Sequence, residues 1–197
     1  PAVGGDRSGT GWSISGGVLT VSRDASLVKA ISDLTPPSNR RGSILEYVVL
    51  TVVSSMPAEG AFRPPMASAE KTSPWTEADL DIGGLPTLLP PFGAPSPAAL
   101  MAEYPSGVFQ LHVTSGSNKR RFDATRAGAT YGAQQAQEHN IRHLALMLNA
   151  SEASKRILLI QRVQHGIDVY GRATQPGAVW EDNGGLNFGP KHALLFA

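Results

Sequence analysis

The sequence contains no cysteine, which excludes disulfides, thiolate zinc sites, iron–sulfur clusters and cysteine nucleophiles. Charge is also scarce: charged residues make up 17% of the 197, and 17 basic against 16 acidic side chains leave a net charge of +1. A chain so balanced has no long-range field to attract nucleic acid or an anionic membrane, so neither is an expected partner. The longest apolar runs, at 47–53 and 144–148, are too short to span a bilayer.

Glycine and proline are abundant instead, with 21 and 15 of the 197 residues. Together they make up about 18% of the chain, against an average usage of roughly 12%. An apolar content of 41% is too high for a disordered chain. The composition therefore predicts a folded protein with long connections between its elements.

The first 55 residues predict strands. Residues 12–15 alternate apolar and polar side chains, Gly16-Gly17 can form a tight turn, and residues 18–21 can return as a second strand. Residues 44–53 are β-branched and almost continuously apolar, which is typical of a strand covered on both faces. We expect a β-sandwich-like part over 1–55.

Residues 56–97 are rich in proline, including the pairs Pro64-Pro65 and Pro90-Pro91, so regular structure should be sparse. Large apolar residues such as Phe62, Trp75 and Phe92 are nevertheless scattered through the segment, which predicts an ordered, irregular strap packed over another surface. Residues 98–129 are expected to be a mixed connection, with a short helix at 97–104 and a strand at 107–114.

A helical region is expected over 130–197, with Ser151 as the N-cap of its second helix. Its first two helices should form an antiparallel hairpin. The predicted apolar stripes consist of Ile141, Leu144, Ala145 and Leu148 on the first helix and Ile157, Ile160, Val163, Ile167 and Tyr170 on the second. Residues 190–197 predict the start of a third helix whose remainder is missing, so that Leu194, Leu195 and Phe196 need cover from a continuation or from another subunit.

His139 and His143 are four residues apart, a spacing at which two imidazoles on one helix can share a metal. Asn140 stands where a zinc peptidase has its glutamate base, so that activity is not expected. The alternative is a pair of histidines on a solvated or interdomain face, opposite the apolar stripe. No metal site is predicted.

His165 and Asp168 stand at positions i and i+3 near the end of the second helix, close enough for a carboxylate to orient an imidazole as a general base. Tyr170 could serve as the acid. These three are the candidate catalytic residues. The alternatives are an interface histidine paired with an aspartate, and a tyrosine that belongs to the core.

The loop at 180–192 combines aromatic, acidic and amide side chains and leads into a predicted helix. Trp180 could stack on a sugar ring, Asp182 and Asn183 could hydrogen-bond its hydroxyls, and Lys191 completes the candidate carbohydrate-binding set. The alternative is a plain connection between helices. The loop lacks the ending of a phosphate-binding loop and the chain has no dinucleotide fingerprint, so no cofactor is predicted.

The order of motifs resembles a group of uncharacterised bacterial and phage-associated proteins, in which a β-rich region precedes a helical region similar to the α/α toroids of polysaccharide lyases. The motifs that carry the resemblance are Ala61-Phe62-Arg63-Pro64-Pro65, Tyr131-Gly132, Gly166-Ile167-Asp168-Val169-Tyr170-Gly171, Val179-Trp180, Gly184-Gly185 and Gly189-Pro190-Lys191. That pattern has a histidine at the position of Leu186 and an arginine at that of Pro190, so this chain lacks two polar groups there. The resemblance implies a fold of the α+β class whose helical part begins a larger toroid-like domain.

Two functions are expected from different classes. The first is a carbohydrate-recognising or carbohydrate-processing part of a surface, secreted or virion-associated protein, with a glycan as partner and, if catalytic, with lyase-like or glycoside hydrolase-like chemistry. The second is a non-catalytic structural subunit of a virion or extracellular filament, bound to other protein chains. Both place the protein outside the cell or on a virion surface, in an oligomer or larger assembly.

Overall fold

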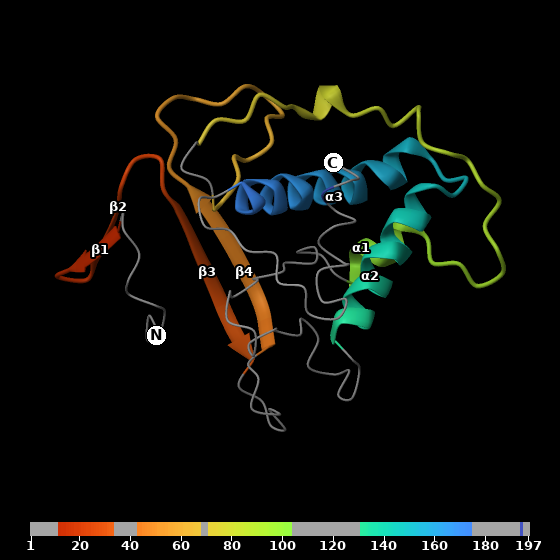
Figure 1. Cartoon of the computed structure of the whole chain (residues 1–197), viewed down its shortest axis with the longest axis horizontal. Coiled ribbons are helices and arrows are strands. Elements are labelled where there is room, and N and C mark those ends of the chain that lie inside the picture. Colours follow the sequence, from red (N-terminus) through yellow and green to blue (C-terminus); the bar gives the residue numbers. More distant parts are fainter. Residues whose placement is uncertain (1–11, 34–42, 68–70, 104–130, 175–193, 195–197) are drawn as a thin grey trace.

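The computed structural model of the chain describes residues 12–33, 43–67, 71–103, 131–174 and 194. The fold is mixed α+β, as predicted, with small antiparallel hairpins in the N-terminal part and three helices packed together in the C-terminal part (Figure 1). The strands are β1 (Trp12–Ser15), β2 (Val18–Val21), β3 (Ser26–Asp33) and β4 (Ser43–Thr51). The helices are η1 (Glu77–Asp79, a 3-10 turn), α1 (Pro97–Glu103), α2 (Tyr131–Leu146) and α3 (Glu152–Ala173).

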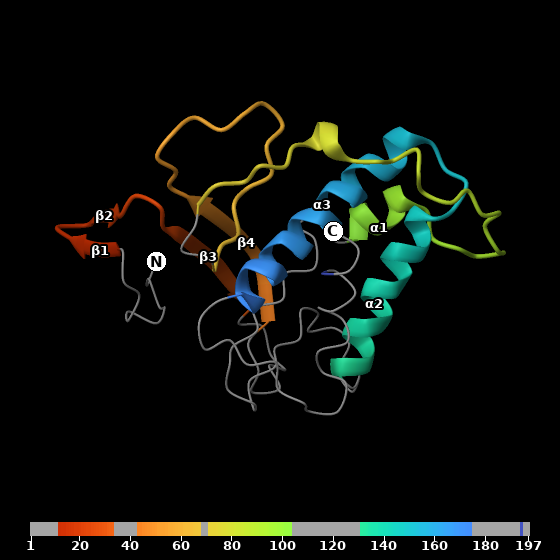
Figure 2. The same cartoon turned by 45° about the horizontal axis from the view of Figure 1, so that its top comes forward.

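The predicted hairpin at 12–21 forms, because Gly16 and Gly17 adopt positive φ angles of 56° and 80° that close a tight turn. The register pairs Ile14 with Leu19, so these two apolar side chains share one face of the ribbon. The hairpin extends away from the helices at one end of the molecule (Figures 1 and 2).

The second hairpin pairs β3 with β4, with a register shift between Ile31 and Ser32. Its open end is fastened by a hydrogen bond of 2.9 Å between the hydroxyls of Ser26 and Thr51. The expectation that residues 44–53 are covered on both faces is wrong for the described side chains, because Val48 and Leu50 are exposed. The described strands form two separate two-stranded sheets, so no sandwich is shown.

Residues 56–67 and 71–96, here called the strap, contain only η1 and isolated bridges, since prolines remove the amide donors that a ladder needs. The strap runs along α3 and continues to α1 (Figure 1). It is fixed to the connection between α2 and α3 at Leu88, whose amide donates to the carbonyl of Met147 at 2.8 Å and whose carbonyl accepts from the amide of Asn149 at 2.7 Å. The segment is thus ordered both by contacts with distant residues and by hydrogen bonds of its own, such as those from the amide of Phe62 to the carbonyl of Trp75 and from the amide of Glu77 to the carbonyl of Gly60.

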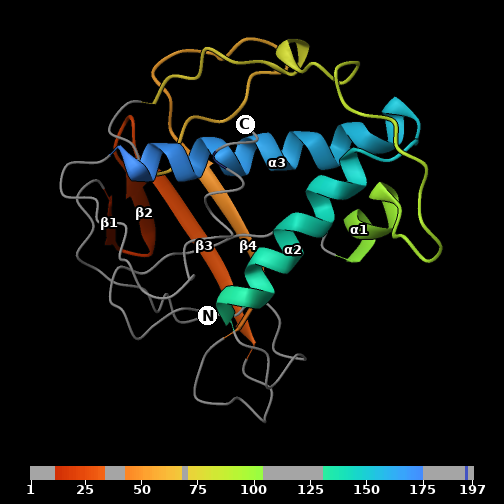
Figure 3. The same ribbon diagram turned by 45° about the vertical axis from the view of Figure 1, so that its right-hand side comes forward.

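The hydrophobic core lies where α1, α2, α3 and the strap meet. It consists of Ile82, Leu100, Ala145, Leu146, Leu158 and Leu159. The helices α2 and α3 meet at their short connection and diverge from it, so they do not lie alongside each other as a hairpin would (Figures 1 and 3). No toroid is shown.

The predicted apolar stripes match the buried faces only in part: Ala145 and Ile167 are buried, and Ile141 and Val163 pack against the core. Leu144, Ile157 and Tyr170 are 58%, 57% and 52% exposed. In their place, polar side chains are buried on both helices, and these are His139, Arg142, His143, Lys155, Arg162, His165 and Asp168. His139 and His143 are buried, so of the alternatives given for them a solvated face is wrong.

Several expectations fall outside the described residues: the strand at 107–114, the loop at 180–192 and the helix at 190–197, of which only the half-buried, helical Leu194 is described. Among the described helices, none is both long and apolar enough to cross a membrane.

The predicted N-cap of α3 is present, because the Ser151 hydroxyl accepts a hydrogen bond of 3.2 Å from the amide of Ser154. We expect Ser151→Ala to lower the free energy of unfolding by about 1 kcal/mol in chemical denaturation, since a helix amide loses its acceptor. Ser151→Asp supplies a new acceptor and should restore the loss. Equal losses in both variants would show that the cap does not stabilise the helix.

Candidate functional site

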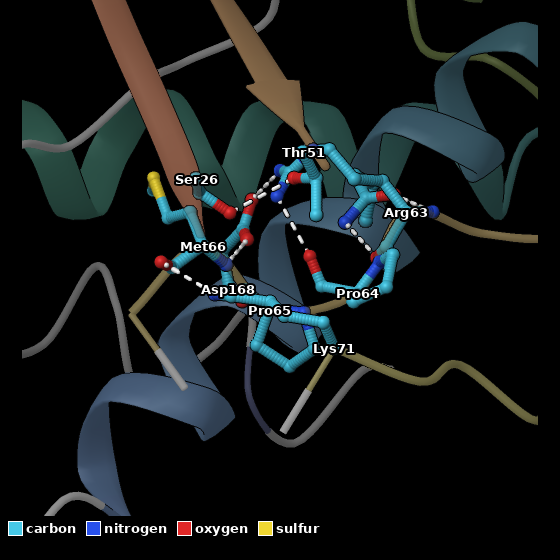
Figure 4. A network of polar contacts seen from close by, with 9 residues as sticks. Ser26, Thr51, Arg63, Pro64, Pro65, Met66, Lys71 and Asp168 are labelled. Atoms are coloured by element: carbon cyan, nitrogen blue, oxygen red, sulfur yellow. Dashed lines mark hydrogen bonds and ion pairs between the residues drawn. The ribbon is translucent and has the colours of Figure 1, made fainter. Parts of the chain in front are cut away.

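The strap docks on α3 through a network of polar contacts (Figure 4). The backbone amide of Arg63 donates to Oε1 of Gln164 at 2.9 Å, and Nε2 of Gln164 donates back to the carbonyl of Arg63 at 3.0 Å. The side-chain amide of Gln164 therefore pairs with one backbone residue as a neighbouring strand would. This reciprocal pair fixes the direction in which the strap crosses the helix.

Asp168 lies at the centre of the network and is buried. Its carboxylate forms an ion pair with the Arg63 guanidinium and accepts a hydrogen bond of 2.9 Å from the backbone amide of Met66. Arg63 also donates from Nη1 to the carbonyl of Pro64 at 2.8 Å. One carboxylate thus holds both ends of the segment 63–66 against α3.

The ammonium of Lys71 supports the same turn of the strap. Its Nζ donates to the carbonyls of Pro65 and Met66 at 2.8 and 3.0 Å. Burial lowers the pKa of Lys71 below its usual value, the nearby Arg63 lowers it further, and Asp168 and Asp24 act in the opposite direction. The network thus contains two cationic side chains, Arg63 and Lys71, and one buried carboxylate, Asp168. Each of the three hydrogen-bonds to the backbone of residues 64–66 and so holds this part of the strap in place.

The helix and the strap approach closely at Gly171. A Cβ added there would lie 2.1 Å from Cβ of Pro65, nearer than atoms can approach without movement. Glycine at this position therefore allows the contact between α3 and Pro65.

We expect Gly171→Ala to lower the free energy of unfolding by about 1–3 kcal/mol, as overpacking does, although alanine favours a helix interior. The proline ring is rigid, so the strap itself must move. Gly83→Ala is the matched control, because its Cβ would have its nearest neighbour at 3.9 Å. Urea denaturation of both variants tests this, and a stabilised Gly171→Ala variant would contradict the close contact.

A second polar cluster lies between α2 and α3. It comprises His139, Arg142, His143, Arg162 and His165, all buried. Nη1 of Arg162 lies 2.8 Å from Nδ1 of His139. Because a guanidinium only donates, Nδ1 must accept, and the imidazole hydrogen of His139 is then on Nε2. The His139 ring stacks on His165 with centroids 5.2 Å apart and lies 6.3 Å from His143.

The electrostatics of this cluster keep His139 neutral. Burial, followed by the neighbouring His165, Arg162, His143 and Arg142, pushes the pKa of His139 well below its usual value of 6.5. A neutral imidazole can accept from an arginine that would otherwise repel its protonated form. In the described part of the chain, no group of three histidine or carboxylate side chains is placed to hold a metal ion.

The three candidate catalytic residues have different surroundings. Asp168 holds Arg63 and Met66, His165 stacks on His139, and Tyr170 is half exposed. The candidate carbohydrate-binding residues Trp180, Asp182, Asn183 and Lys191 lie outside the described residues.

Four members of the polar clusters were not predicted from the sequence: Arg63, Lys71, Arg142 and Arg162. Arg63 lies in the motif at 61–65, one of those that carry the family resemblance, and no other feature of the sequence singled it out. For the two helical arginines, the regular spacing of His139, Arg142 and His143 along one face of a helix could have indicated a polar buried face.

Comparison with known proteins finds no matching family model, no similar curated protein and no similar solved structure.

Proposed function

We propose that this chain is a non-catalytic structural subunit of a multichain assembly, such as a virion or an extracellular filament. The observation that carries the proposal is the exposure of large apolar side chains on ordered backbone. On the hairpins these are Ile14, Val18, Leu19, Val48 and Leu50, and on the strap they are Leu88, Leu89 and Phe92.

Single exposed apolar residues are normal on a protein surface, but six of these eight, all except Val48 and Leu50, are concentrated in two uncharged stretches. Residues 12–21 carry no charged side chain, and neither do residues 82–102. Burial of each Leu, Ile, Val or Phe is worth roughly 1.5–3 kcal/mol, so covering such surfaces favours association. Surfaces of this kind mark interaction sites.

The polar clusters also favour a structural role. Asp168 is occupied by the strap, and His139 is occupied by Arg162. These side chains bind backbone and other side chains, and they hold the strap and the helices in position. We assign no reaction step to them.

The test is the native mass of the purified chain, measured by light scattering and native mass spectrometry over a range of concentrations. Assembly predicts multiples of 20.8 kDa that grow with concentration. A mass of 20.8 kDa at every concentration, with no particles in electron micrographs, would contradict a self-assembling subunit.

Carbohydrate recognition is the second candidate, favoured by the exposed aromatic rings of Trp75 and Tyr170. Exposed aromatic faces stack on sugar rings, and Trp180 in the predicted loop would add another. In this proposal the helices begin a toroid-like domain packed against a β-sandwich-like part, at a virion or cell surface.

A glycan array tests the carbohydrate proposal. Specific binding that is lost in Trp180→Ala and kept in Trp12→Ala would support it. An array without binding by the assembled wild-type protein would contradict it.

A further inference from the structure

The nitrogen-rich side chains between α2 and α3, here called the basic cluster, are His139, Arg142 and His143 of the first helix and Arg162 and His165 of the second. All five residues are buried, and the two arginines are only 2% and 1% exposed. A guanidinium stays protonated in proteins, so the cluster holds two permanent positive charges away from water. Burial of such charges is unfavourable unless an opposite charge accompanies them.

The described residues contain little buried negative charge to match. Their one buried carboxylate belongs to Asp168, which pairs with Arg63 and the amide of Met66 in the strap. Burial and all four neighbours in the cluster lower the pKa of His139, which shows that the field around its imidazole is positive. The basic cluster therefore favours a negatively charged ligand.

Hydrogen-bonding capacity also remains in the basic cluster. Each of its residues makes contacts within the fold, and Arg162 uses Nη1 for Nδ1 of His139. Four further nitrogen atoms are buried without a hydrogen-bond partner in the described part of the chain: Nη2 of Arg142, Nε of Arg162, and Nε2 of His143 and of His165. The arginine atoms among them can only donate, so the group that completes their surroundings is an acceptor.

We propose that the basic cluster binds a small oxyanion, such as phosphate, sulfate or a carboxylate, between α2 and α3. Oxygen atoms of the ion accept from the two guanidinium groups, whose forked donors match such oxygens. The imidazoles of His143 and His165 can donate to the same ion from Nε2. This ligand is additional to the assembly proposed above and does not depend on it.

Two other occupants fit the basic cluster less well. Two guanidinium groups repel a metal cation, and no set of three histidine or carboxylate side chains in the described residues is placed to hold one. A water molecule would accept from one or two of the nitrogen atoms, but it would leave the positive charge unbalanced.

Urea denaturation of the full chain tests the site, because a ligand that binds only the folded state stabilises it. Sulfate, phosphate and acetate are each compared with chloride at equal ionic strength and neutral pH. Unfolding and refolding in each anion allow a buried site to fill. We expect at least one of the three to raise the urea midpoint with saturation at millimolar concentration, and the anion with the largest effect identifies the preferred oxyanion. Isothermal titration calorimetry of the wild type should then give one ion per chain.

Arg162→Gln should weaken this binding at least tenfold, because one of the two guanidinium groups is lost. Arg156→Gln is the matched control, since it removes the same charge from α3 at a side chain that is 46% exposed, and it should bind as the wild type does. Should Arg162→Gln fail to fold, Arg162→Lys gives the same comparison, because it keeps the charge and loses the fork.

Sulfate and phosphate also stabilise proteins by exclusion from their surfaces, an effect that rises steadily with concentration and is equal in all variants. A midpoint that rises only in this way, without saturable binding in calorimetry, would show an adventitious ion only and overturn the proposal. Saturable binding that persists unchanged in both Arg162 variants would overturn it too, by placing the ion elsewhere. So would the absence of a response to all three anions.

Discussion

Replacement of Asp168 by alanine should lower the free energy of unfolding by about 2–4 kcal/mol, the largest loss expected of a single polar substitution in this chain. The carboxylate is buried, forms an ion pair with Arg63 and accepts from the amide of Met66 at 2.9 Å. Its removal leaves a partly buried guanidinium and a backbone donor without their acceptor. Urea denaturation followed by circular dichroism measures the loss.

Asp168→Asn separates the charge from the shape of the side chain. The amide oxygen can still accept from Met66, but the charge that balances Arg63 is gone, so the loss should be smaller than with alanine. The second described ion pair gives the control: Arg156 and Glu77 lie 3.8 Å apart with both side chains well exposed. Glu77→Ala should cost less than about 1 kcal/mol, as exposed pairs do.

A second measurement shows which part of the fold the substitution of Asp168 loosens. Because Asp168 fastens residues 63–66 to α3, its loss should release the strap before the helices unfold. Limited proteolysis should then cut the strap of Asp168→Ala faster than that of the wild type. A variant with wild-type stability and an uncut strap would show that the network does not hold the strap in place.

The elements could be predicted from local pattern more readily than their packing. The Gly16-Gly17 turn, the capped start of α3 and the irregular backbone of the proline-rich residues each depend on a few adjacent side chains. The partners of Asp168 could not be predicted in that way, because Arg63 lies 105 residues earlier in the chain. No periodicity connects positions so distant.

The buried faces of the helices were predicted only in part, for a related reason. Hydrophobic periodicity assigns the apolar stripe to the core, so it placed Ile157 inside and His139 outside. The structure buries His139 because Arg162 and the imidazole of His165 complete its surroundings from another helix. Burial of a polar side chain is unfavourable unless other groups hydrogen-bond to it, and the sequence of one helix does not reveal partners that lie on another.

Acid should destabilise the fold through the cluster between α2 and α3, and this is the second large effect expected. The pKa of His139 is well below 6.5 in the folded chain, mainly because of burial and then because of the cationic and imidazole neighbours. In the unfolded chain it returns to about 6.5. Above that pH neither state is protonated, and this residue contributes no pH dependence.

Below pH 6.5 the unfolded state binds a proton that the folded state does not take up. The free energy of unfolding should therefore fall by up to about 1.4 kcal/mol for each pH unit, until the pH reaches the lowered pKa of the folded state. The stability is present above the unfolded pKa and lost on acidification. Chemical denaturation at a series of pH values between neutral and mildly acidic gives the slope.

His139→Asn isolates this residue from the other groups that titrate in acid. Its side-chain oxygen can accept from Arg162 in place of Nδ1, but it takes up no proton in this range. Below pH 6.5 the free energy of unfolding of the variant should depend less steeply on pH, by up to the contribution of one proton. The dependence that other titrating groups produce should remain. Equal slopes in wild type and variant would mean that His139 is protonated in the folded chain. The guanidinium of Arg162 would then face a cation in a buried place, which the 2.8 Å contact between Nη1 and Nδ1 argues against.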